Sequence, residues 1–192
     1  MTERSDLANL RALGEPRVHE WAGATEPIGA GLVEWTRLAI GHDQQLAVRA
    51  ALEACALVIG GYPAGAAGAA GAADTTSPAP RAYLDHMVSV IRRWLDEPTR
   101  DHRDAVRASL DDTRQRHAWQ TDDAAPAWIL EAVDHACLCV WAGERASYII
   151  PLDFATTAGR VIACVFHAMR TGGADEQRAA DAVIDVVLRV TA

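Results

Sequence analysis

Apolar residues in this chain recur at the three- to four-residue spacing of one helix face. The clearest example comprises Val48, Leu52, Cys55 and Ile59. No segment alternates polar and apolar residues with the period of two that a half-buried strand requires, and no Asn-Gly or Asp-Gly hairpin turn occurs. The pattern predicts an all-α fold, a single-domain bundle of six to seven helices.

The expected helices have recognisable start and stop signals. The residues that can cap a helix at its start are Ser5, Asp43 and Thr99. The residues expected to end a helix are Gly41 and Pro98.

One stretch interrupts the helical pattern. Residues 61–80 read GYPAGAAGAAGAADTTSPAP, in which repeated glycines disfavour helix and the prolines block it. Neither GxGxxG nor GxxxxGK[ST] occurs there, so the stretch does not match a phosphate-binding loop. We predict a flexible Gly/Ala/Pro-rich surface loop that joins two helical halves, 1–60 and 81–192, within one domain spanning 1–192.

The charge balance bears on what the chain can bind. It has 18 basic residues, all of them arginine, against 26 acidic residues, and its formal net charge is −8. Phosphate backbones require a basic face, so we expect no nucleic-acid partner. We expect the partner to be another protein. If the overall negative charge of the chain governs the contact, that protein is basic. Homo-oligomer formation is left open.

The expected compartment is the cytoplasm. The first ten residues, MTERSDLANL, carry acids and lack the apolar centre of a secretory signal. No run of about 18 uncharged apolar residues exists, which predicts no membrane span. The four cysteines form no CxxC pair, and we expect them to be reduced, as small buried hydrophobic residues.

Two pairs of residues have the local spacing of metal ligands. His135 and Cys139 are separated by four positions, and Cys164 and His167 by three, so each pair shares one helix face. If the two helices pack face to face, the four side chains could hold zinc. The alternative is that the cysteines fill the core and the histidines bond locally, with no cofactor.

Acidic residues next to one of these histidines form a second candidate site. Glu131, Asp134 and His135 lie on a helix predicted over 125–142. Apolar residues cover most of the circumference of this helix, which predicts that it is the central helix of the bundle. A carboxylate beside a histidine could act as an acid–base pair. The other interpretation, which we favour, is a solvent-facing strip, because burying these groups unpaired would be costly.

A polar stripe on the helix predicted over 151–170 is the third candidate site. Its members are spaced by 4, 3, 4 and 3 positions: Asp153, Thr157, Arg160, Cys164 and His167. Opposite it, a track of small residues would let another helix approach closely: Ala155, Gly159 and Ala163. The stripe lines a pocket or a partner surface, or else it is an ordinary outward face.

Tryptophan is unusually frequent, with six Trp against two Phe. Trp119 falls beside a predicted loop, where a large aromatic side chain either anchors a contact or covers the core. No serine lies in a GxSxG or SxxK context, and no HExxH pattern is present. We therefore assign no catalytic residue.

The order of segments in the second half of the chain is similar to that of a known family. An acidic break that contains a proline follows the segment Ile91-Arg92-Arg93-Trp94-Leu95, and a charged helix follows the break. Together with the Ala-rich helices that contain an internal His, this order of segments resembles the small helical immunity proteins of bacterial polymorphic-toxin systems. The resemblance covers residues 81–170, whereas the 61–80 insert and SYIIPLDF depart from it. It implies that the protein binds and neutralises a cognate toxin, and it assigns no functional residue.

Two functions are compatible with these features. The first is a non-enzymatic helical protein that acts by protein–protein binding, with immunity to a toxin as one form. The second is a metal- or small-ligand-binding bundle, enzymatic or not, that uses the zinc-type residues or the Asp153–Arg160 stripe.

Overall fold

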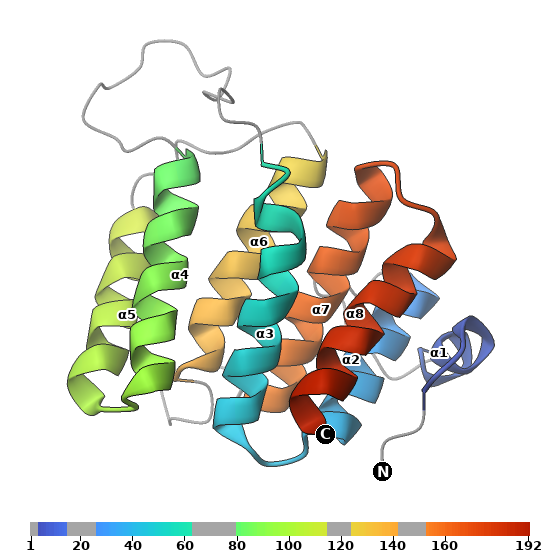
Figure 1. Cartoon of the computed structure of the whole chain (residues 1–192), viewed down its shortest axis with the longest axis horizontal. Coiled ribbons are helices and arrows are strands. Elements are labelled where there is room, and N and C mark those ends of the chain that lie inside the picture. The colour runs from blue at the N-terminus through green and yellow to red at the C-terminus, as the bar shows by residue number, and fades with distance from the viewer. Residues whose placement is uncertain (1–3, 15–25, 63–79, 115–123, 142–152) are drawn as a thin grey trace.

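The computed structural model describes residues 4–14, 26–62, 80–114, 124–141 and 153–192, and within these ranges it is all-helical. The predicted fold class is confirmed, but these ranges contain eight helices rather than six or seven. They are α1 (Leu7–Leu13), α2 (Pro27–Ile40), α3 (Gln44–Ile59), α4 (Pro80–Asp96), α5 (Arg100–Arg114), α6 (Ala124–Cys139), α7 (Phe154–Thr171) and α8 (Glu176–Thr191) (Figure 1). None of these helices is long and apolar enough to cross a membrane.

Helix ends follow the local capping chemistry of the sequence. Asp43 begins α3, where its carboxylate accepts a hydrogen bond from the Leu46 amide at 3.0 Å. Gly41 ends α2 with φ of 65°, a backbone conformation that side chains disfavour. At α1 the cap is Asp6 rather than the expected Ser5, and the short helix persists because α1 packs on α2.

The predicted loop at 61–80 lies mostly outside the described residues. Its two ends are described, and both belong to the folded bundle. Tyr62 is buried in the core, and α4 already begins at Pro80. Helix α3, which precedes this stretch, packs against α4, α6, α7 and α8, all of which follow it in sequence.

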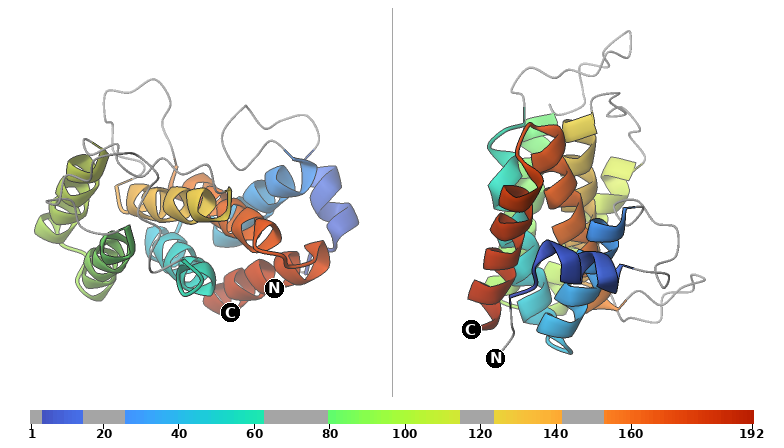
Figure 2. Two further views of the ribbon diagram at one scale, coloured as in Figure 1. Left: turned by 90° about the horizontal axis from the view of Figure 1, so that it is seen from above. Right: turned by 90° about the vertical axis from the view of Figure 1, so that its right-hand side faces the viewer.

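Helix α7 is the centre of the bundle. It packs against α2, α3, α6 and α8, and Figure 2 shows it enclosed by them. Every residue from Thr157 to Ala168 is buried, including the polar ones. The apolar residues around α6 predict that α6 is the central helix, but α7 takes that place. The small residues of α7 reverse that order, since at Gly159 the backbone of α2 comes so close that an added Cβ would lie 2.7 Å from the Val33 oxygen.

Helices α4 and α5 form a pair at one side of the molecule (Figure 1). The only apolar residues that α5 contributes to the core within its described part are Val106 and Leu110, as its thin stripe predicts. Pro98 separates the two helices, and the Thr99 hydroxyl accepts a hydrogen bond from the His102 amide at 3.3 Å. The turn between α4 and α5 therefore stands at the surface, next to the end of α6.

Candidate functional site

Buried polar side chains gather between α6 and α7. The described chain buries five polar or charged residues: Thr36, His135, Thr157, Arg160 and His167. Four of the five belong to α6 or α7. We call this strip the α6–α7 seam, and its members are Trp128, Glu131 and His135 of α6 with Thr157, Arg160, Cys164 and His167 of α7.

The two helices run antiparallel along the seam. At one end the rings of Trp128 and His167 stack, with centroids 4.9 Å apart and an angle of 26° between planes. At the other end the Cys139 thiol lies 3.9 Å from the Phe154 oxygen. This register puts Glu131 level with Cys164. The polar stripe predicted on α7 therefore faces α6 and is interior, which excludes an ordinary outward face for all of it except Asp153.

Glu131 and His135 form a pair at the edge of the seam. The Glu131 Oε1 and His135 Nε2 atoms are 3.5 Å apart, and the Glu131 side chain is 43% exposed while that of His135 is 11% exposed. The buried His135 Nδ1 has no hydrogen-bond partner among the described residues. Asp134 points elsewhere and accepts a hydrogen bond from the Tyr83 hydroxyl of α4 at 2.8 Å. The three residues therefore do not form one solvent-facing strip.

Arg160 lies inside the seam, while Asp153 stays exposed at the start of α7. The Asp153 side chain caps the helix by accepting from the Thr156 amide at 2.8 Å, and the Thr157 hydroxyl donates to the Asp153 carbonyl at 2.8 Å. Burial lowers the pKa of Arg160 from its ordinary value, and the negative charge of Asp153 acts in the opposite direction. The two predicted residues are thus electrostatically linked along α7.

All four cysteines are free and buried. Burial raises the pKa of the Cys55 thiol to about 12 and that of Cys139 and Cys164 well above the ordinary value. For Cys164 the negative charge of Glu131 raises the pKa further. Zinc binds the thiolate, and no three histidine, cysteine or acidic side chains of the described ranges form a metal-ligating group. Zinc binding by His135, Cys139, Cys164 and His167 stays a prediction.

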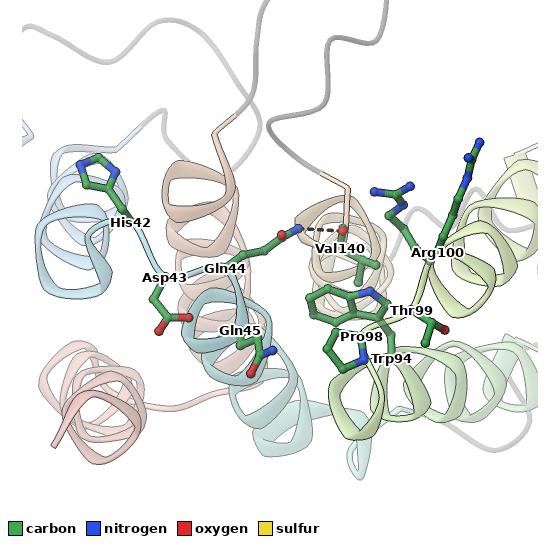
Figure 3. Close-up of a pocket in the computed structure, with 10 residues that line it drawn as sticks. His42, Asp43, Gln44, Gln45, Trp94, Pro98, Thr99, Arg100 and Val140 are labelled. Atoms are coloured by element: carbon green, nitrogen blue, oxygen red, sulfur yellow. Dashed lines mark hydrogen bonds between the residues drawn. The ribbon is translucent and has the colours of Figure 1, made fainter.

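A second feature, which sequence reasoning missed, is an open groove of about 580 Å³ at one end of the bundle. We call it the end groove. Three segments that are distant in sequence meet there: the turn from α2 to α3, the turn from α4 to α5, and the end of α6 (Figure 3). Its lining residues are His42, Asp43, Gln44, Gln45, Trp94, Pro98, Thr99, Arg100, Arg103 and Val140.

Hydrogen bonds and a buried ring hold the end groove in shape. The Gln44 amide donates to the Cys139 oxygen at 3.1 Å and to the Val140 oxygen at 2.7 Å, so that α3 caps the last turn of α6. Figure 3 shows the bond to Val140. Trp94 is 5% exposed and lies in the middle of the lining residues in Figure 3. The floor of the groove is therefore tied to the core. At its rim His42 and Arg100 are exposed and Arg103 is half-buried.

The rim carries the charge. The Arg100 side chain is 82% exposed, and its Nε atom is 3.6 Å from an Asp104 oxygen. Arg103 follows one turn later on α5, and His42 is exposed across the groove. Asp43 is the one acidic lining residue, and its carboxylate is engaged by the Leu46 amide. One local signal could have pointed here, because arginines in the first turn of a helix oppose its dipole.

The candidate binding residues predicted from sequence are thus dispersed. The seam contains Glu131, Thr157 and Arg160, whereas Asp153 is at its open end and Asp134 faces α4. Trp119 lies outside the described residues. None of these residues lines the end groove. No protein-family model, curated protein or solved structure matches the chain.

Proposed function

We propose that this protein is a non-enzymatic binding protein whose partner is another protein, and that the end groove is the contact site. The observation that carries the proposal is the lining of the groove, in which seven of ten residues are polar or charged. Pockets for small molecules are mostly apolar and enclose their ligand. An open, polar groove suits a segment of another protein better.

The rigidity of the groove supports the same function. Its parts are held by the Gln44 hydrogen bonds to the end of α6 and by the buried Trp94. A preformed site saves the cost of ordering loops on binding. The resemblance to immunity proteins gives the proposal its specific form, in which the partner is a toxin that the protein neutralises.

Growth rescue tests this proposal. The toxin candidate encoded beside the gene is co-expressed with the wild-type protein, with the groove variant Arg100→Glu/Arg103→Glu, or with the control variant Arg92→Glu/Arg178→Glu. The control residues are exposed, lie outside the groove and give the same change of formal charge. We expect rescue by the wild type and by the control, and loss of rescue with the groove variant.

The groove variant is expected to fold. Glutamates in the first turn of α5 agree with the helix dipole better than the arginines they replace. In the control, a glutamate at position 178 stands three residues after the cap Asp175, an arrangement that resembles a capping box. Equal rescue by both variants would refute the groove as the contact site, and failure of the wild type to bind the toxin candidate would refute the toxin as partner.

The α6–α7 seam favours a second candidate function, the binding of a small polar ligand or of zinc. An arginine and two histidines buried on one helix seam are costly unless they serve a purpose or are well paired. Elemental analysis of the purified protein tests the metal form. Stoichiometric zinc that is lost in Cys164→Ser and His167→Ala would support it, and an unchanged metal content in both variants would exclude this site.

A further inference from the structure

The charge of the end groove is opposite to that of the chain as a whole. The protein has a formal net charge of −8, yet the groove rim contains two arginines and a histidine against one acid. We propose that the end groove binds an acidic peptide segment of the partner protein, with Arg100 and Arg103 pairing its carboxylates. This inference rests on the proposed function and names the chemistry of the partner at that site.

The position of the two arginines suits carboxylates. Arg100 and Arg103 are three residues apart, so they lie on the same face of the first turn of α5. A guanidinium has five N–H donors in a planar fork and pairs with a carboxylate through two of them at once. At 3.6 Å and with 82% of its side chain exposed, Arg100 is only loosely held by Asp104, so an incoming carboxylate meets an accessible donor group.

Helix ends of both signs surround the groove. Helices α3 and α5 both begin at the groove, and the N-terminal ends of helices carry a partial positive charge. Helices α2, α4 and α6 end there, and of these negative ends that of α6 has two carbonyl oxygens covered by the Gln44 amide. The carboxylate of Asp43 is already engaged by the α3 backbone. The preference for a negatively charged ligand therefore comes from the side chains of Arg100 and Arg103.

The spacing of the arginines also indicates the form of the acidic segment. Three residues of helix advance about 4.5 Å along the axis. In an extended peptide, side chains at alternate positions point the same way and are about 7 Å apart, a separation that two long arginine side chains can span. An extended segment with acidic residues at alternate positions fits this site.

Fluorescence anisotropy with a labelled peptide tests the inference. The probe is the peptide Glu-Ser-Glu-Ser-Glu, and the uncharged peptide Gln-Ser-Gln-Ser-Gln is its control. Both are titrated with the wild-type protein, with Arg100→Glu/Arg103→Glu and with Arg92→Glu/Arg178→Glu. We expect the acidic peptide to bind the wild type and the control variant with affinities within about twofold, and to bind the groove variant at least tenfold more weakly, with binding that weakens as salt rises.

The outcomes separate the two proposals. Equal binding of the acidic peptide to both variants, or equal binding of the acidic and uncharged peptides to the wild type, overturns this inference. Competition by inorganic phosphate as effective as that by the free acidic peptide would also overturn it, because the groove would then be a general anion site. If growth rescue depends on the groove and the acidic peptide does not bind, the proposed function stands and only the acidic segment is refuted.

Discussion

Replacement of Gly159 by alanine tests the architecture on which the buried seam depends. Helix α7 crosses α2 at this glycine. A Cβ atom added there would lie 2.7 Å from the Val33 oxygen and 2.8 Å from the Val33 Cα atom. Both of these are backbone atoms, so no change of side-chain rotamer can relieve the clash. The two helices must move apart, and α7 loses contact in the centre of the core.

The expected cost follows from two opposing effects. Overpacking a well-packed core costs about 1–3 kcal/mol, and the clash with backbone at Gly159 places this site in the upper part of that range. Alanine is favoured over glycine within a helix by about 1 kcal/mol, which offsets part of the cost. We expect a net loss of about 1–2 kcal/mol in the free energy of unfolding, equivalent to roughly 2–8 °C in Tm for a chain of this size.

Gly60 provides the matched control. It lies at the end of α3 with φ of −59°, and a Cβ added there would meet nothing within 4 Å. Gly60→Ala should therefore stabilise the protein by up to about 1 kcal/mol. Urea denaturation followed by circular dichroism measures both variants. A Gly159→Ala protein as stable as wild type, with an unchanged urea dependence, would show that α2 and α7 do not approach so closely.

Three further predictions follow from the burial, the packing and the ion pairs. Because burial raises the pKa of Cys55 to about 12 and the other three cysteines are equally buried, a disulfide-exchange reagent at pH 8 should react with almost no thiol in the folded protein and with four thiols per chain in denaturant. Rapid reaction of the native protein would contradict the burial of the cysteines. A Cβ added at Gly31 would overlap the backbone of α1, so Gly31→Ala should separate α1 from the bundle and speed tryptic cleavage at Arg11, with little change in the main unfolding transition. A large fall in Tm would instead place α1 within the cooperatively unfolding core. Hydrogen bonding to Arg4 lowers the pKa of Asp181 from its ordinary 3.8, so the pair stabilises the fold above pH 3.8 and this stabilisation is lost as the pH falls through the lowered pKa. In an NMR titration of Arg4→Ala the pKa of Asp181 should return toward 3.8, and an unchanged pKa would exclude the pairing.

Features that depend on neighbouring residues were predictable from the sequence. The all-helical class, the caps at Asp43 and Thr99 and the breaks at Gly41 and Pro98 all arise from interactions within a few positions. The helix count was too low, and the expected cap at Ser5 was wrong by one residue. A seven-residue helix such as α1 is unstable alone, and only its packing on α2 decides that it forms.

The depth of each helix in the bundle was harder to predict. The residues of the α7 stripe were identified, but their spacing alone could not decide between an inward and an outward face. Hydrophobicity ranked α6 as more central, since its side chains are larger and more apolar around the helix. What decides the order is close approach, which Gly159 permits on one side of α7 while the polar stripe faces α6 on the other.

The end groove could not be derived from any single segment, because its walls are three turns that meet only when the bundle closes. The one local sign of the groove in the sequence is that Arg100 and Arg103 stand at the start of α5, where the helix dipole favours acidic residues. Helix α5 does carry one acid in its first turn, Asp101, as α8 carries Glu176, but the two arginines stand beside it. The dipole of α5 disfavours these arginines, the Arg100–Asp104 pair offsets part of that cost, and carboxylates from another chain would offset more of it. In Arg100→Glu/Arg103→Glu the gain at the helix dipole is opposed by the loss of the Arg100–Asp104 pair and by repulsion between position 100 and Asp104, so this variant should lose binding with little change in Tm.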